Sequence, residues 1–248
     1  MPKAKKPHKH TPEGLLSSFL KSYLFLLKTI NKENLFSTSN NKIKGLWPMY
    51  STTNLLDKIY FVNLGPYKSD NENYFEWTTK YNPKSTFFEI KLTRNAPEKN
   101  IFYCVKKADI ELVYFVRNEV VFTIGADPEV QSLLLETIME HLMEEFFKIY
   151  DESLLMTCYG DRCDIFNGFS RVIRDTLKNL NQLDLYKTAL VHCKGCNKTI
   201  KIIIKRSLVE NATKPTVPIV YAHSGHAVLV YVDKQYKVRG NELVTISY

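Results

Sequence analysis

The residues best suited to chemistry in this chain of 248 residues are two cysteines and two histidines near its C-terminus. Cys193 and Cys196 are separated by two residues, one of them Gly195, and His223 and His226 have the same spacing. A Cys-x2-Cys turn lets two thiolates meet one ion, and its glycine permits the turn. Four such ligands complete the closed tetrahedral shell of a structural zinc site, so the spacing predicts one here.

Other interpretations of the same four residues remain open. The His-x2-His spacing is tighter than that of the usual zinc finger, so His223 or His226 can be a turn residue in a protein without metal. The cysteine pair can be a redox dithiol. Cys193, a histidine and Asp233 can also form a hydrolase site, because nucleophile and base need only meet in space.

Enzymatic function has little further support in the sequence. It contains no Gly-x4-Gly-Lys phosphate loop, no His-Glu-x2-His helix and no Gly-x-Ser-x-Gly elbow. A second cysteine pair, Cys158 and Cys163, is predicted to be ordinary loop or core thiols, with Asp164 as the N-cap of the next helix. The sequence therefore favours a non-enzymatic protein.

The four candidate ligands belong to a segment, residues 185–248, that reads as a small β-rich module. Its short apolar runs are interrupted by Pro215, Pro218 and Gly240. The predicted strands cover residues 189–192, 200–204, 217–221, 227–232 and 243–247. A module of about 60 residues can bury only a small apolar core, and a bound metal ion commonly adds to the stability of such small domains.

Residues 54–184 are predicted to form a larger α+β domain, an antiparallel β-meander covered by amphipathic helices. Strand patterns are found at residues 59–64, 74–79, 86–94, 101–105, 110–116 and 120–124. Asp127, Pro128 and Glu129 are typical of a helix start, and a helix is predicted over 129–150. A second amphipathic helix begins near Asp164.

The helix predicted at 129–150 has an apolar and an acidic face. The residues expected to face the sheet are Val130, Leu133, Leu134, Ile138, Leu142, Phe146 and Ile149. Met139 and Met143 are expected in the core. The residues expected on the opposite face are Glu136, Glu140, Glu144 and Glu145.

The N-terminal part is predicted to be a disordered basic tail over residues 1–11, followed by an N-terminal helix and linker over 12–53. The helix, at 12–31, has a wide apolar stripe that fits either the protein core or a membrane surface. No secretory signal or membrane-spanning stretch is apparent, and five scattered cysteines do not form a secreted disulfide framework. A cytoplasmic protein is expected.

The net charge of +8 is distributed unevenly. Both ends of the chain are basic, whereas residues 119–155 hold nine acidic residues and one lysine, Lys148. A solvated lysine-rich surface explains the basic ends most simply. Contact with nucleic acid, or peripheral membrane contact through the basic N-terminus, remains an alternative.

The strand pattern at 101–105, 110–116 and 120–124, followed by the helix that ends in Phe146 and Phe147, resembles longin and roadblock-type modules. The resemblance spans about residues 55–181. It implies a profilin-like domain that takes part in protein–protein interaction, with a small GTPase or a trafficking component as partner. A longin domain has a helix between its second and third strands, and Pro83 with its neighbours leaves no room for one.

The sequence therefore predicts a non-enzymatic interaction or scaffold module with a zinc-binding β-rich appendix. The first alternative is a zinc-dependent nucleic-acid-binding protein that uses the basic C-terminal module. The second is a Cys/His hydrolase or redox enzyme.

Overall fold

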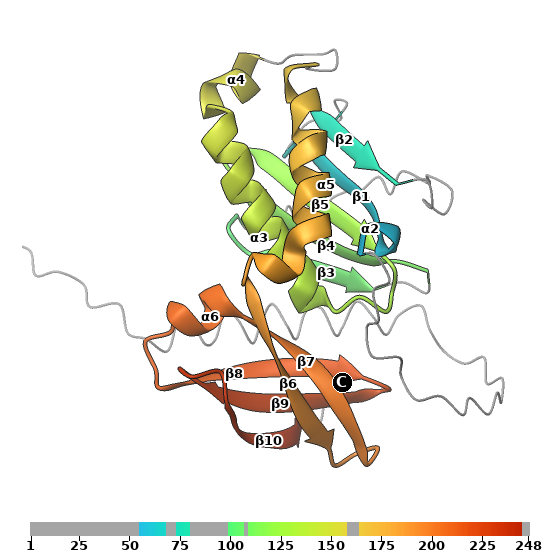
Figure 1. Ribbon diagram of the computed structural model, residues 1–248, viewed down its shortest axis with the longest axis vertical. Coiled ribbons are helices and arrows are strands. Elements are labelled where there is room, and N and C mark those ends of the chain that lie inside the picture. The colour runs from blue at the N-terminus through green and yellow to red at the C-terminus, as the bar shows by residue number, and fades with distance from the viewer. Residues whose placement is uncertain (1–54, 68–72, 80–98, 107–108, 158–163, 245–248) are drawn as a thin grey trace, which may run out of the picture. The chain divides into compact units, whose positions relative to one another are not determined.

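A computed structural model describes residues 55–67, 73–79, 99–106, 109–157 and 164–244 (Figure 1). The predicted tail at 1–11, the helix and linker at 12–53, the strand at 86–94 and the Cys158–Cys163 pair lie outside these residues. All described residues belong to one compact unit, residues 45–248. The boundary between 184 and 185 stays a prediction.

Helices and antiparallel sheets are both present, which confirms the α+β class. The first part of the described chain contains α2 (Leu55–Lys58), β1 (Ile59–Pro66), β2 (Phe75–Thr78), β3 (Phe102–Lys106), β4 (Glu111–Arg117), β5 (Val120–Ala126), α3 (Ser132–Ile149), α4 (Glu152–Thr157), the 3-10 helix η1 (Asp164–Gly168), α5 (Phe169–Asn179) and the 3-10 helix η2 (Leu180–Gln182). The last part contains β6 (Tyr186–Cys193), β7 (Lys198–Lys205), α6 (Arg206–Glu210), β8 (Thr216–His223), β9 (His226–Asp233) and β10 (Val238–Val244).

The five-stranded sheet has the order β2-β1-β5-β4-β3 and is antiparallel. β3, β4 and β5 follow one another as in a meander, but β1 lies between β2 and β5. The prediction of a meander throughout is therefore wrong. Every residue of β5 is buried, so this strand lies inside the sheet with a neighbour on each side. One neighbour is β4, and the other is β1 of the β1–β2 hairpin.

A close approach between β1 and β5 depends on one glycine. Phe61 is paired with Gly125, and a Cβ atom on Gly125 would lie only 2.4 Å from the Phe61 ring. The register shifts between Ile59 and Phe61, as at a β-bulge. The absence of a side chain at Gly125 therefore leaves the space that the Phe61 ring occupies.

Helix α3 begins at Ser132, three residues after the predicted start. The Asp127 carboxylate accepts a hydrogen bond from the Glu129 N–H (2.8 Å), and the Asp127 carbonyl accepts one from the Val130 N–H (2.9 Å). These bonds form a turn before the helix instead of its first turn. The N-cap is Gln131, whose side chain makes no capping bond.

The apolar face of α3 packs on the sheet through a cluster of aromatic rings. Phe146 is fully buried, and its ring centroid lies 5.8 Å from that of Phe122 on β5, 5.4 Å from Phe166 and 5.1 Å from Phe169. One side chain thus joins β5, α3, η1 and α5. Met139 and Met143 are buried, as predicted, but two residues of the expected stripe lie elsewhere: Ile149 is exposed, and Leu133 packs against the C-terminal core.

The C-terminal strands form a three-stranded sheet, β10-β9-β8, and a two-stranded sheet, β6-β7. Apolar residues of both sheets share one core. Its fully or almost fully buried members are Val191, Cys193, Ile202, Ile204, Val209 of α6, Val228, Val230 and Val232. Strands are found at the first four predicted positions, whereas β10 begins five residues before the strand predicted at 243–247, whose residues 245–247 are not described. Helix α6 was not predicted.

Helix α3 also contacts β7, through Gln131. Its side-chain amide donates a hydrogen bond to the Lys201 carbonyl (2.8 Å), and its oxygen accepts one from the Ile203 N–H (3.1 Å). The Lys201 carbonyl and the Ile203 N–H are backbone groups two residues apart on the edge of β7, where a neighbouring strand would form hydrogen bonds. The Gln131 side chain thus satisfies part of the β7 edge, which explains why it does not cap its own helix.

Two glutamates of α3, expected on the face opposite its apolar stripe, have partners in other elements. Lys205, at the end of β7, is buried, and its Nζ lies 3.2 Å from Glu140 Oε1 and 4.4 Å from the centre of the Phe102 ring. Glu136 accepts a hydrogen bond from the Cys104 thiol at 3.3 Å. Buried charges require such partners, so the acidic face of α3 is partly covered by β7 and β3.

Removal of an aliphatic side chain from α3 should destabilise the protein only where the helix faces the sheet. Ile138 is fully buried and Ile149 is 51% exposed. We expect Ile138→Ala to lower the free energy of unfolding by about 2–5 kcal/mol, and Ile149→Ala by less than about 1 kcal/mol. Chemical denaturation checks both variants, and equal losses would contradict this packing of α3.

The environment of Glu136 should make stability depend on pH. Burial, the largest effect, raises the pKa of Glu136 above its usual 4.5, and Lys205 and the Cys104 thiol lower it by less. A carboxyl with a raised folded pKa contributes stability below its unfolded pKa and loses that contribution as pH rises through the folded pKa.

Glutamine at this position cannot ionise. The stability of Glu136→Gln relative to the unsubstituted protein should therefore increase as pH rises from about 4 to about 8. Urea unfolding at several pH values measures this difference, and Glu144→Gln, on an exposed part of the same helix, controls for loss of one carboxylate. A relative stability that falls with pH would contradict the raised pKa.

Candidate metal centre

Two β-hairpins carry the candidate ligands, each at its turn. Cys193 is the last residue of β6, and Cys196 lies in the turn to β7. His223 is the last residue of β8 and pairs directly with His226, the first residue of β9. The two hairpins belong to different sheets, so a group held by both joins the sheets at one point.

Backbone conformation defines the β8–β9 turn. Ser224 and Gly225, its two central residues, have positive φ angles of 47° and 78°. Positive φ at both central residues is the signature of the tight two-residue hairpin turn whose twist matches that of the strands. In the β6–β7 turn, Asn197 has a φ of 55°.

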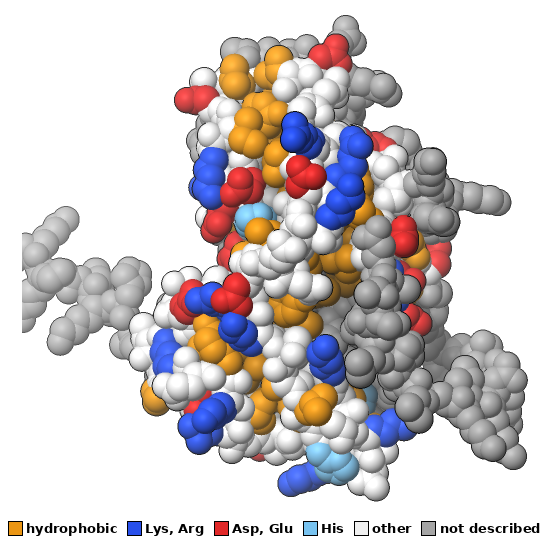
Figure 2. Space-filling model, in the orientation of Figure 1, with side chains coloured by type: hydrophobic (Ala, Val, Ile, Leu, Met, Phe, Trp, Pro, Cys, Tyr) orange, Lys and Arg blue, Asp and Glu red, His pale blue; other side chains and the backbone are white. Residues whose placement is uncertain are grey.

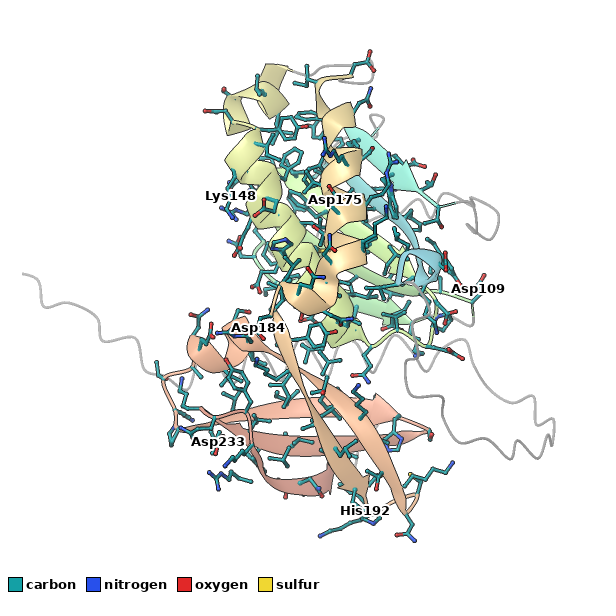
Figure 3. The ribbon with its side chains drawn as sticks, in the orientation of Figure 1. Asp109, Lys148, Asp175, Asp184, His192 and Asp233 are labelled. Atoms are coloured by element: carbon teal, nitrogen blue, oxygen red, sulfur yellow. The ribbon has the colours of Figure 1, made fainter. Side chains whose placement is uncertain are left out.

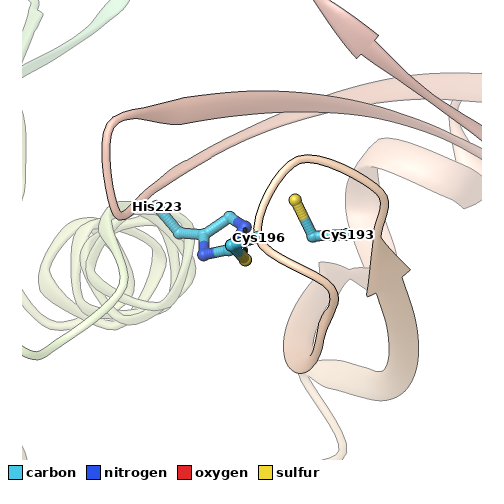
Figure 4. Close-up of side chains that lie close together, drawn as sticks. All are labelled: Cys193, Cys196 and His223. Carbon is cyan, nitrogen blue, oxygen red and sulfur yellow. Dashed lines mark hydrogen bonds between the residues drawn. The ribbon is translucent and has the colours of Figure 1, made fainter.

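Three of the four predicted ligands come together. The Sγ atoms of Cys193 and Cys196 and a ring nitrogen of His223 all lie within 4.8 Å of one another (Figure 4). The Cys196 Sγ and the His223 Nε2 are 3.9 Å apart. A tetrahedral zinc ion with ordinary bond lengths holds sulfur and nitrogen ligands about 3.6 Å apart, so small side-chain movements suffice to bind one.

The fourth predicted ligand, His226, is described only in its backbone. Directly paired residues of an antiparallel pair lie on the same face of the sheet. Its pairing with His223 therefore puts its backbone beside the cluster, and its role as a ligand stays a prediction.

The cluster lies at the edge of the C-terminal core. Cys193 is fully buried, while Cys196 and His223 are partly buried. Burial raises the pKa of the Cys193 thiol, but the backbone N–H groups of Cys196 and Gly195 together with the Cys196 thiol lower it more, and the net shift is downward. The thiolate is the form that binds a metal.

The structure does not assemble all members of the hydrolase alternative. Cys193 and His223 belong to the cluster, in which the Cys196 thiol lies 3.9 Å from the His223 imidazole. A thiol–histidine site also needs a third group that orients the base. Asp233, the third member of the hydrolase alternative, instead bonds the Lys237 and Gln235 N–H groups and Arg239.

One buried charge cluster was missed by the sequence reasoning. Glu136 and Glu140 lie one turn apart on α3, but Lys205 is more than 60 residues away in the sequence, and the three residues follow no motif. Cys104, buried beside Glu136, lies in the five-stranded sheet and belongs to this cluster, not to the metal centre.

The fold and the cluster define an α+β protein with antiparallel sheets and a Cys2His group able to take a metal ion. No protein-family model matches this chain, and no curated protein matches it significantly. Among the helices that the structure describes, none is long and apolar enough to cross a membrane.

Metal content tests the centre directly. We expect protein purified without chelator to carry about one equivalent of zinc by elemental analysis, because the ligand set is that of a closed zinc site. Cys193→Ser, His223→Ala and His226→Ala should each lower this content. Cys104→Ser, a change to a buried thiol outside the cluster, should not.

Chelation provides a second measurement. A metal shared by the two hairpin turns closes a loop of about 30 residues and so restricts the unfolded chain. Removal of the metal should raise amide hydrogen exchange in β6 to β9 and leave β1 and β5 protected. Protein without metal, or exchange unchanged by the chelator, would exclude a structural zinc ion.

Proposed function

We propose that this chain is a non-enzymatic protein–protein interaction module of scaffold type, with a structural zinc ion in its C-terminal part. The observation that carries the interaction function is a group of exposed apolar side chains at one end of the helical layer. Ile149 and Ile165 are each 51% exposed, and Leu154 is 37% exposed. Contiguous apolar groups on a protein surface mark places where partners bind.

Aromatic packing holds these three residues at the same end. The Phe166 ring, next to Ile165, lies 4.9 Å from the Tyr150 ring, next to Ile149. Helix α4, which carries Leu154, begins two residues after Tyr150. Figure 2 shows hydrophobic side chains on the surface at this end of α3 and α5.

The rim of this apolar surface is polar. Lys148 is exposed and pairs with Glu145 at 2.7 Å, and Asp151 accepts a hydrogen bond from the Ser153 N–H. An apolar centre with a polar rim is the usual anatomy of an interface between proteins.

The class of partner rests on the resemblance to longin and roadblock-type modules. Three successive strands, β3, β4 and β5, followed by α3, supply the pattern on which that resemblance was based. A small GTPase or a trafficking component in the cytoplasm is the partner that it implies. The zinc ion has a separate function in this proposal, because it stabilises the β-rich module and takes part in no reaction.

A binding experiment with matched variants tests the interaction function. The immobilised protein is exposed to lysate, captured proteins are identified by mass spectrometry, and the affinity of each purified candidate is measured. Ile149→Ser combined with Ile165→Ser should weaken binding of the true partner at least about tenfold, as expected at the centre of an interface.

Leu243→Ser is the control, because Leu243 is 44% exposed on β10, away from these helices. It should leave the affinity unchanged. Equal binding by the double variant would show that this apolar surface is not the interface. The prediction of a zinc ion does not depend on that outcome, because zinc content is measured separately.

A further inference from the structure

The exposed part of the β6–β7 hairpin near its turn combines a leucine with lysines. Leu190 is 70% exposed, and its direct partner across the hairpin is Lys201. His192 is exposed two residues further along β6, and Lys194 and Lys198 are exposed at the turn. We call these five residues the hairpin surface. Figure 3 labels His192 near the turn of the β6–β7 hairpin.

The positive charge of this surface is not balanced locally. The acidic side chains of the C-terminal part are all engaged elsewhere. Asp184 pairs with Lys187 and Arg206, Glu210 with Arg206, Asp233 with Arg239, and Glu242 accepts a hydrogen bond from Tyr231. Within the described residues, Lys194, Lys198 and Lys201 have no acidic partner. Figure 3 shows Asp184 and Asp233 away from His192.

The composition of the hairpin surface distinguishes between anionic partners. Nucleic-acid surfaces typically use arginine for bidentate contacts and aromatic rings for base stacking, and the hairpin surface has neither. Lysine is a compact, hydrated point charge, suited to a diffuse anionic surface. A leucine exposed among lysines fits the boundary between lipid headgroups and acyl chains, where the side chain leaves water and the charges meet headgroups.

We propose that the hairpin surface binds the anionic surface of a lipid bilayer, with Leu190 entering the headgroup region and Lys194, Lys198 and Lys201 contacting lipid phosphates and carboxylates. This contact is peripheral. It goes beyond the proposed function and does not depend on the identity of a protein partner. It would orient the molecule with the turns of the metal-binding hairpins near the membrane.

Vesicle sedimentation tests the proposal on the full chain as purified. The vesicles consist of phosphatidylcholine alone or of a mixture with about one third phosphatidylserine. We expect binding only to the anionic vesicles. Each basic residue near such a surface strengthens binding about fivefold, so Lys194→Gln, Lys198→Gln and Lys201→Gln together should weaken it about 100-fold. Leu190→Ser should weaken it several-fold without a change in charge.

The control removes three lysines elsewhere. Lys178, Lys214 and Lys237 are exposed outside the hairpin surface, and their triple substitution by glutamine gives the same net charge as the first triple variant. We expect it to bind vesicles nearly as the unsubstituted protein does. Equal losses in both triple variants would mean that net charge alone drives binding, and would overturn the proposal.

Two other outcomes would also overturn it. One is equal binding to neutral and anionic vesicles. The other is binding to single-stranded RNA or duplex DNA that is tighter than vesicle binding at physiological salt and is lost in the hairpin variants, because the partner would then be nucleic acid. A folded triple variant, shown by an unchanged thermal transition, makes each result interpretable.

Discussion

Helix α3 is buried on two sides, and this constraint determines most of the described structure. One side inserts Ile138, Leu142 and Phe146 between the five-stranded sheet and α5. The other side meets β7 through Gln131 and Glu140. The acidic residues on the side that meets β7 need partners, and Lys205 supplies a buried positive charge there. The sheet and the C-terminal strands thus share one element, although each has its own apolar core.

The C-terminal strands illustrate how a small core is supplemented. Their two sheets pack through valines and isoleucines, and the Cys2His cluster lies where the turns of the two hairpins meet. Apolar packing acts along the strands, and a metal ion would fix the turns, where few side chains are buried. Near these turns the outward residues Leu190, His192 and Lys201 are exposed, whereas α3 covers the other end of β7. A hairpin end with an exposed Leu190 is suited to contact with a surface that offers no pocket.

Two apolar surfaces therefore have different physical characters. The surface around Ile149 and Ile165 is bordered by paired charges of both signs, which suits a protein partner with a polar rim. The hairpin surface has lysines without acidic partners, which suits an anionic partner without defined shape. A protein that binds a partner at one surface and a bilayer at the other would bring that partner to the membrane.

The sequence alone determined the elements whose signals are local. Period-two alternation located the described strands, the apolar stripe located α3 and α5, and the Cys-x2-Cys and His-x2-His spacings located the cluster. Tertiary structure alone decided the order β2-β1-β5-β4-β3, because strand pairing depends on which faces are buried and not on chain order. It also decided that Glu140 pairs with Lys205, that Glu136 bonds the Cys104 thiol, and that Ile149 is exposed. Periodicity shows that a helix has two faces, but what covers each face depends on residues distant in the chain.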